Sequence, residues 1–370
     1  MSRSPFEPAH GGNLVWAARL ARCAPHELLD FSASISPLGP PPSVLAAIQA
    51  AFSSLTAYPD PRYQALCQQL ARVHEIDADW VLPGNGAAAL LTWAGRELAQ
   101  HPCWLLTPAF SDYARAVAAF AGQVIEVPLQ QQHWPTDPDW AAALTAAIPA
   151  GTDLSQCSLL LNNPHNPTGA LLSREAIRPF LETFGLVVVD EAFMDFLPPS
   201  QQQSLIAWVE SFPNLVVLRS LTKFYSLPGL RMGYAVAHPH RLRRWQQWRD
   251  PWSVNTLAAA AAIAALQDTD FQQQTWDWLG VAKPDLYAGL AALPGLSPRP
   301  GSANFLLVDC DCPSPKLQKQ LLIRHRIYIR DCSSFAEIGD RAFRVAVKTG
   351  ADHQRLLAGL ADVLSDGVME

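Results

Sequence analysis

The sequence predicts an α/β fold, in which a mainly parallel sheet carries helices on both faces and a smaller α+β domain follows. From about residue 80 to 240, short apolar runs alternate with longer helical stretches, a pattern typical of strands buried on both faces. After about residue 250 the strands become shorter. Of the 370 residues, 49% are hydrophobic and 16% are charged, so the chain can fill a large core.

The large domain is expected to contain six strands with helices between them. Because parallel strands deliver the residues that follow them to one edge of the sheet, a site is expected at that edge. The expected strands are 104–107, 124–127, 159–161, 186–190, 216–218 and 233–236, and the clearest helices are 137–148 and 173–184.

The smaller domain is expected to begin after an abrupt change of pattern. An alanine-rich helix leads into three short strands and a last helix, and the first 40 or so residues are expected to join this domain. We therefore predict a large domain at 41–250 and a small domain formed by 1–40 and 251–370. The expected elements are a helix at 256–267, strands at 304–308, 326–329 and 343–347, and a helix near 352–364.

Composition limits the possible partners and compartments. A net charge of −6 argues against nucleic acid or an anionic membrane surface. The longest apolar run, 257–266, is half of the ~20 residues that a membrane span needs. Seven scattered cysteines without a paired CxxC spacing predict neither disulfides nor a metal site. With no signal peptide visible at the start, a cytoplasmic protein is expected.

The segment 220–234 carries the strongest chemical signal. It follows a predicted strand and combines Ser220, Thr222 and Lys223 with Arg231 eight residues after the lysine. A lysine amine can form a Schiff base with an aldehyde cofactor, while the hydroxyls and the guanidinium can bind that cofactor's phosphate. The alternative for a lone lysine is an ordinary surface position, which the apolar neighbours and the companion motifs disfavour.

Two companion motifs also follow predicted strands. Asp190 ends the strand 186–190, where its carboxylate can pair with the protonated pyridine nitrogen of pyridoxal phosphate. Asn166 lies in the turn 162–169, which two prolines and a glycine fix, and its amide can reach the ring hydroxyl. Alone, an aspartate at a strand end is more often a helix cap or a metal ligand, and the alternative for the turn is an ordinary loop.

Two weaker motifs precede these in the chain. Gly86 and Ala87 begin a predicted helix, whose small residues let backbone N–H groups approach a phosphate. Phe110 follows the strand 104–107 and could stack on a flat ring. Each has an ordinary alternative, a turn for the glycines and a core position for the aromatic side chain.

Together these motifs resemble the fold-type-I pyridoxal-phosphate enzymes, in the branch that contains histidinol-phosphate aminotransferase, over essentially the whole chain. The resemblance implies a seven-stranded-type sheet and pyridoxal 5'-phosphate as cofactor. It makes Lys223 the Schiff-base lysine and Asp190 the partner of the ring nitrogen, and these are the two predicted catalytic residues. The predicted cofactor-binding residues are Gly86, Ala87, Phe110, Asn166, Asp190, Ser220, Thr222, Lys223, Arg231 and Tyr58.

Two positions carry further implications of this resemblance. In the family, the tyrosine matching Tyr58 reaches the phosphate in the neighbouring subunit, which implies a homodimer with shared active sites. Phe193 stands where histidinol-phosphate aminotransferases usually have a tyrosine that contacts the ring hydroxyl. Asn166 must therefore act without that second hydrogen bond.

Several segments resemble the L-threonine-O-3-phosphate decarboxylases of cobalamin synthesis more than the aminotransferases. The most discriminating is Ala9-His10-Gly11-Gly12-Asn13, because a transaminase has no evident need for it. His10 and the amide of Gly11 could bind a substrate phosphate, although a loose N-terminal segment is the alternative. Ser34 and Ser36 stand where this subfamily commonly has asparagines, so some direct substrate contacts are expected to be lost.

The substrate of such an enzyme carries a carboxylate and a phosphate. Arg330 and Arg344, at the ends of two predicted small-domain strands, are implied as the anion-binding pair. The predicted substrate-binding residues are His10, Gly11, Ser34, Arg330 and Arg344, with the anion taken by each arginine left open.

Three functions are weighed. The first is decarboxylation of L-threonine O-3-phosphate to (R)-1-aminopropan-2-yl phosphate in cobalamin biosynthesis. The second is an aminotransferase acting on histidinol phosphate or a related amino acid. The third is a non-catalytic protein on the same fold, which the presence of Lys223, Asp190 and Arg231 disfavours.

Overall fold

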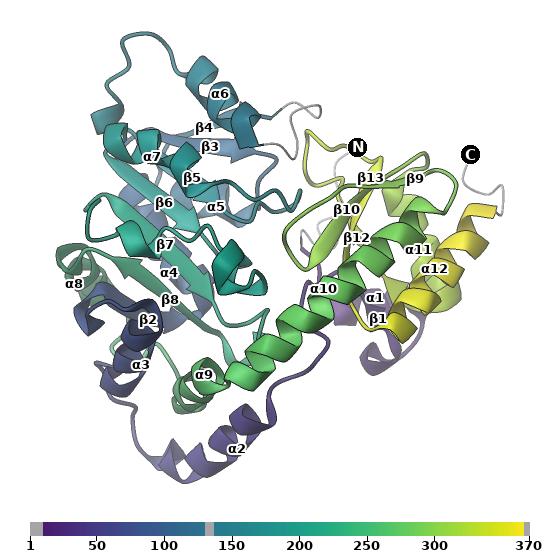
Figure 1. Cartoon of the computed structure of the whole chain (residues 1–370), viewed down its shortest axis with the longest axis horizontal. Helices are drawn as coiled ribbons and strands as arrows, with labels where there is room; N and C mark the ends of the chain where they lie inside the picture. Colours follow the sequence, from purple (N-terminus) through teal and green to yellow (C-terminus); the bar gives the residue numbers. More distant parts are fainter. Residues whose placement is uncertain (1–9, 130–136, 366–370) are drawn as a thin grey trace.

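The large domain is built on a seven-stranded sheet (Figure 1). The computed structural model describes residues 10–129 and 137–365. In spatial order the strands are β2 (Val81–Asn85), β8 (Met232–Ala237), β7 (Leu215–Ser220), β6 (Leu186–Asp190), β5 (Ser158–Asn162), β3 (Cys103–Thr107) and β4 (Val124–Pro128). Only β8 runs antiparallel to its neighbours. The predicted fold class is confirmed.

Helices cover both faces of this sheet because side chains alternate along each strand. Val188 of β6 packs into a cluster with α4 (Gly86–Leu98), α5 (Asp112–Ala118) and α8 (Pro239–Trp248). Val187 and Val189 belong to a second cluster on the other face. The helices of that face are α3 (Gln64–His74), α6 (Asp137–Ala147), α7 (Arg174–Thr183) and α9 (Thr256–Gln267), and α2 (Pro42–Ala50) packs against α9.

The small domain contains a four-stranded antiparallel sheet in the order β12 (Arg330–Asp331), β13 (Ala342–Ala346), β10 (Phe305–Cys310), β9 (Leu296–Pro298). Its helices are α10 (Thr269–Ala291), α11 (Ser314–His325) and α12 (Gly350–Ser365). In Figure 1 the long helix α10 leads from the large domain into the small one.

The N-terminal segment lies against the small domain. Strand β1 (Leu29–Asp30) pairs in parallel with β11 (Ile327–Tyr328). Helix α1 (Leu14–Ala21) packs on α11, burying Ala17 beside Leu322 and Tyr328. The residues between β1 and α2 can therefore pass from the small domain to the large one across the edge where the parallel strands end.

Within residues 10–129 and 137–365, no helix combines the length and the apolar character that crossing a membrane requires. All seven cysteines lie in this described part and are free thiols.

Candidate active site

A cavity of about 340 Å³ lies where β5, β6 and β7 end, between the large domain and the N-terminal segment. It brings together residues that are far apart in the sequence. Its described lining residues are His10, Gly11, Ser32, Ala33, Ser34, Ile35, Ala87, Ala88, Leu91, Phe110, Asp112, Asn166, Asp190, Ala192, Phe193, Ser220, Thr222, Lys223, Arg231 and Arg344. Most of the predicted site residues are in this set.

Lys223 reaches into the cavity from the loop that follows β7. Its Nζ lies over the ring of Phe193, 4.9 Å from the ring centroid. Burial lowers the pKa of the Lys223 amine, Arg344 and Arg231 act in the same direction, and Asp190 opposes them. A lowered pKa increases the fraction of neutral amine, which is the form that attacks an aldehyde.

Asp190 is a buried carboxylate at the end of β6, held by two hydrogen bonds. The hydroxyl of Tyr113 donates to Oδ2 at 2.8 Å, and the backbone N–H of Ala192 donates to Oδ1 at 3.0 Å. Burial raises the pKa of Asp190, while Tyr113, Lys223 and Ala192 lower it. A cationic ring nitrogen in the cavity would add the opposite charge that favours the ionised form.

The N-terminal end of α4 and the loop after β7 form a cradle suited to a phosphate. Helix α4 begins at Gly86, which has a φ of +74°, and a Cβ there would lie 2.6 Å from a guanidinium nitrogen of Arg231. Ser220 Oγ and Thr222 Oγ1 lie 2.7 Å apart on the same side. Helix N–H groups, two hydroxyls and a guanidinium together are well matched to a phosphate dianion.

Asn166 is held by its neighbours so that its amide group faces the cavity. Asn162 Oδ1 accepts a 2.7 Å hydrogen bond from the backbone N–H of Asn166, and Asn162 Nδ2 donates at 2.8 Å to the carbonyl of Asp190. Arg344 donates to Asn166 Oδ1. Because that oxygen is already an acceptor for Arg344, the amide N–H₂ is the group that can donate to a ring oxygen.

Phe110 and His10 lie together at one wall of the cavity. Their rings are 4.9 Å apart with a tilt of 44°. His10 Nε2 lies 3.6 Å from Asp112 Oδ1, and Arg115 Nε donates to the same carboxylate at 2.7 Å. The contact with His10, ahead of that with Arg115, lowers the pKa of Asp112 to about 2. His10 therefore belongs to this wall of the cavity.

Gly11 and Gly12, which follow His10, both lie against Ser32. A Cβ on Gly11 would lie 2.2 Å from the carbonyl oxygen of Ser32, so the two backbones touch. The backbone N–H of Gly12 donates to Ser32 Oγ at 2.8 Å. Ser34 Oγ is buried with no hydrogen-bond partner among the described residues, and Ser34 lines the cavity. An unsatisfied buried hydroxyl at this position fits a ligand contact.

The two predicted arginines differ in position. Arg344 lines the cavity, with its guanidinium 4.6 Å from the centroid of Phe305, and burial lowers the pKa of Arg344 to about 10. Arg330 faces Arg344 in the β12–β13 register but is not among the described residues that line the cavity. Its Nη2 donates to Ser334 Oγ at 2.7 Å. A direct substrate contact of Arg330 stays a prediction.

Tyr58 does not contribute to the cavity of its own chain. Its side chain is 78% exposed and stacks on Trp252 with centroids 4.4 Å apart. This exposure leaves the hydroxyl of Tyr58 accessible to a neighbouring molecule.

Three functional positions were missed by the sequence analysis. Tyr113 binds Asp190, Asn162 fixes both Asn166 and Asp190, and Asp112 contacts His10. Asn162 had a detectable signal, because it directly follows the predicted strand 159–161. For Tyr113, the signal is its position three residues after Phe110, in the first turn of α5.

Pyridoxal phosphate fits this site. Lys223 would hold its aldehyde carbon, Asp190 its ring nitrogen, Asn166 its ring oxygen and the cradle at α4 its phosphate. The fold is that of the fold-type-I pyridoxal-phosphate enzymes. The chain belongs to the aminotransferase class I and II family, whose model matches residues 26–360.

Within this family, two relatives and one solved structure show which proteins the chain is similar to. It is 40% identical to threonine-phosphate decarboxylase of Salmonella typhimurium, over 97% of this chain and 98% of the relative. It is 33% identical to histidinol-phosphate aminotransferase of Symbiobacterium thermophilum, over 92% of each chain. The structure of histidinol-phosphate aminotransferase from Sinorhizobium meliloti in complex with pyridoxal-5'-phosphate has a TM-score of 0.83 at 25% identity, covering 98% of each chain.

Proposed function

We propose that the protein decarboxylates L-threonine O-3-phosphate to (R)-1-aminopropan-2-yl phosphate, using pyridoxal 5'-phosphate, as a step of cobalamin biosynthesis. The observation that carries this proposal is the position of His10 and Gly11 on the wall of the cavity that contains Lys223. This segment is the one whose sequence resembles the phosphothreonine decarboxylases. The 40% identity to such an enzyme over nearly the whole chain supports the same substrate.

The substrate has two anions, and the cavity offers groups for both. Arg344 contributes a buried guanidinium, and His10 contributes a ring nitrogen beside the backbone of Gly11. The unpaired hydroxyl of Ser34 can donate to a substrate oxygen. These groups lie on the walls around Lys223, so the substrate would be bound with its Cα near the lysine amine.

When bound, pyridoxal phosphate withdraws electrons from the Cα of an amino acid joined to its aldehyde carbon. Asp190 maintains the positive charge on the ring nitrogen that this withdrawal needs. Arg344, His10 and Ser34 orient the substrate so that its carboxylate, rather than its Cα hydrogen, is the group that leaves. When the bond from Cα to the carboxylate breaks, carbon dioxide departs and the bonding electrons stay on the Cα side. Lys223 Nζ would then deliver the proton that replaces the carboxylate at Cα.

The protein is further proposed to act as a cytoplasmic homodimer with shared active sites. Several exposed large apolar side chains on α2, on the segment that follows it and on a later loop support this assembly, because exposed apolar surface favours a partner. The group comprises Leu45, Phe52, Leu55, Tyr58 and Trp252. Tyr58 from each subunit would donate to the phosphate held by the other.

An aminotransferase is the second candidate, because the chain is 33% identical to a histidinol-phosphate aminotransferase over 92% of its length. In that reaction the Cα hydrogen leaves instead of the carboxylate, and Lys223 moves the proton. The two candidates share the cofactor site and differ in the substrate that the walls select.

The deciding experiment incubates the cofactor-loaded protein with L-threonine O-3-phosphate and measures carbon dioxide and the amine phosphate. We expect both in equal amounts with no 2-oxoglutarate added. Lys223→Ala is the control, and it should also lack the visible absorption that pyridoxal phosphate gains when it is bonded to a lysine amine. Amino transfer from histidinol phosphate to 2-oxoglutarate without carbon dioxide release would instead establish the aminotransferase.

A further inference from the structure

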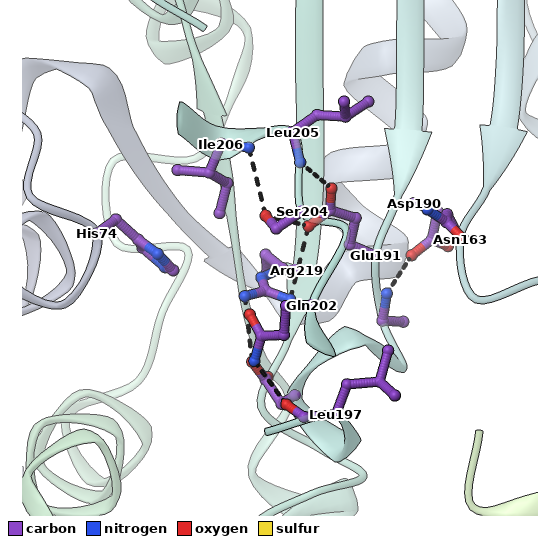
Figure 2. Close-up of polar contacts among 12 residues, drawn as sticks. His74, Asn163, Asp190, Glu191, Leu197, Gln202, Ser204, Leu205, Ile206 and Arg219 are labelled. Atoms are coloured by element: carbon purple, nitrogen blue, oxygen red, sulfur yellow. Dashed lines mark hydrogen bonds and ion pairs between the residues drawn. The ribbon is translucent and has the colours of Figure 1, made fainter. Parts of the chain in front are cut away.

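A buried charged cluster lies behind the wall that carries Asp190 and Ser220. Asp190 and Ser220 line the cavity, and the neighbouring residues Glu191 and Arg219 point to the other side because side chains alternate along extended backbone. Together with Asp195 they form what we call the rear cluster. Figure 2 shows the Glu191 carboxylate pointing toward Ser204, Leu205 and Arg219, and away from Asp190.

The rear cluster consists of one cation between two carboxylates. Arg219 Nη1 lies 3.6 Å from Glu191 Oε2, and Nη2 lies 3.2 Å from Asp195 Oδ1. The side chains of Arg219 and Glu191 are 3% and 0% exposed. Burial alone would lower the pKa of Arg219, but Asp195, Tyr234 and Glu191 together raise it above its ordinary value. The guanidinium therefore stays charged.

Each member of the rear cluster is bonded to, or belongs to, a different segment around the site. Glu191 accepts hydrogen bonds from Ser204 Oγ at 2.7 Å and from the backbone N–H of Leu205 at 2.8 Å. The carbonyl of Asp195 accepts a 2.8 Å hydrogen bond from Trp276 of α10. Arg219 itself belongs to β7. One guanidinium thus links the ends of β6 and β7 to the turn Met194–Phe196, which contacts α10 through Trp276.

Stability alone is a weak explanation for this arrangement. The cost of removing ions from water often equals or exceeds what a buried ion pair gains, so apolar replacements of the same volume are commonly as stable. What the pair does provide is a fixed distance between two strand ends. Asp190, immediately before Glu191, serves the ring nitrogen, and Ser220, immediately after Arg219, serves the phosphate.

We propose that Arg219 is a positioning residue, which binds Glu191 and Asp195 behind the sheet and so fixes the spacing between Asp190 and the phosphate cradle. The inference rests on the proposed cofactor site and is independent of which substrate the enzyme uses. Because only a short CH₂–O arm joins the phosphate of pyridoxal phosphate to its rigid ring, the ring nitrogen and the phosphate can both be bound well only over a narrow range of spacings of these groups.

The test compares two substitutions of the same kind, Glu191→Gln and Glu97→Gln. Glu97 is also buried and binds arginines, since it accepts from Arg241 and, at 2.6 Å, from Arg244. It lies near the C-terminal end of α4, while the cradle is at the N-terminal end. Each substitution removes one buried negative charge and keeps the side-chain size, so both are expected to lower the melting temperature of the cofactor-free protein.

The readouts are the Kd for pyridoxal phosphate and the visible circular dichroism of the bound cofactor. We expect Glu191→Gln alone to raise the Kd by about tenfold and to change the dichroism, because misplaced groups lose charge-assisted hydrogen bonds. Glu97→Gln should match the wild type in both. Wild-type values for Glu191→Gln, or equal changes in the two variants, would overturn the proposal.

Arg219→Lys provides a second variant that retains the positive charge. A single ammonium cannot span two carboxylates as a planar guanidinium does. We therefore expect a higher Kd for pyridoxal phosphate, with the cofactor-free protein still folded. A wild-type Kd and dichroism in Arg219→Lys would also contradict a positioning role. Failure of the wild-type protein to bind pyridoxal phosphate would overturn the cofactor assignment itself, and this inference with it.

Discussion

The hydroxyl of Tyr113 donates a 2.8 Å hydrogen bond to Asp190, from a helix that follows a different strand. Tyr113 also packs edge-on against Phe110, with ring centroids 5.5 Å apart. One side chain therefore supports both the residue predicted to bind the ring nitrogen and the residue predicted to stack on the ring. The electrostatics of Asp190 depend on a residue outside the strand-end motifs.

We predict that Tyr113→Phe weakens cofactor binding while preserving the packing against Phe110. Loss of a hydrogen bond to a charged group costs about 1.5–3 kcal/mol. Tyr113 lowers the pKa of Asp190, so its removal raises that pKa and favours the protonated acid, which pairs poorly with a cationic ring nitrogen. The Kd for pyridoxal phosphate, measured from neutral to acidic pH, should rise more in the variant than in the wild type as pH falls. Parallel curves would contradict this role.

We predict that Gly11→Ala raises the KM for L-threonine O-3-phosphate by about tenfold, because small displacements in a site are costly. The new Cβ would meet the carbonyl oxygen of Ser32 at 2.2 Å, so the segment carrying His10 must move. The Kd for pyridoxal phosphate should change less than the KM, since Lys223, Asp190 and the phosphate cradle belong to other segments. Gly280→Ala is the matched control, because a Cβ at Gly280 on α10 meets nothing within 4 Å. An unchanged KM in Gly11→Ala would argue against a substrate contact there.

The shared-site dimer predicts complementation between two defective chains. Tyr58→Ala removes the hydroxyl proposed to reach the partner's phosphate, and Lys223→Ala removes the reactive amine. In a mixed dimer one site keeps both groups, so a random equal mixture should regain about a quarter of the wild-type rate. Val281→Ala, which shortens an exposed apolar side chain on α10 outside the exposed apolar group that contains Tyr58, should retain cofactor affinity. Activity equal to the mean of the two parents would exclude sharing through Tyr58.

We predict that the free energy of unfolding falls in acid because of the buried ring of His165. Its ring is buried and hydrogen-bonded to Thr168, and burial lowers the pKa of His165 from 6.5 to about 4. Below about pH 6.5 the unfolded chain therefore binds a proton that the folded chain excludes until about pH 4, and the free energy of unfolding falls over this window. Between about pH 7.5 and about pH 5, the wild type should lose about 2 kcal/mol more than His165→Asn in urea unfolding. Equal losses would contradict this assignment.

The sequence predicted the strand-end residues of the site correctly for a topological reason. Parallel strands end at one edge, so Asp190, Asn166 and Lys223 were expected to meet, and all three line the cavity. It did not predict β2, because Pro83 and Gly84 read as turn residues. They are tolerated in β2 because it is an edge strand of the sheet.

Side-chain partners were harder to predict than positions. Arg330 was placed at the end of a small-domain strand, but its contact with Ser334 depends on the loop that follows, which no periodicity encodes. The helix α10 was also missed, because Gly280 and Pro284 interrupt its pattern. The rear cluster consists of ordinary-looking neighbours of motif residues, and only the folded sheet shows that they face one another.

The segment from Phe31 to Ser36 is secured by parts of the chain that are synthesised much later. The backbone N–H of Ser36 donates to the carbonyl of Lys223 at 3.0 Å, and Asn304 Nδ2 donates to the carbonyl of Ser34 at 3.0 Å. The backbone N–H of Ala346 donates to the carbonyl of Phe31 at 2.9 Å. Since chains emerge from the ribosome N-terminus first, a nascent chain that already contains Lys223 still lacks the residues that secure this wall. The wall of the pocket should therefore be complete only when nearly the full polypeptide has left the ribosome. Binding of pyridoxal phosphate in the complete pocket is then expected only at the end of synthesis.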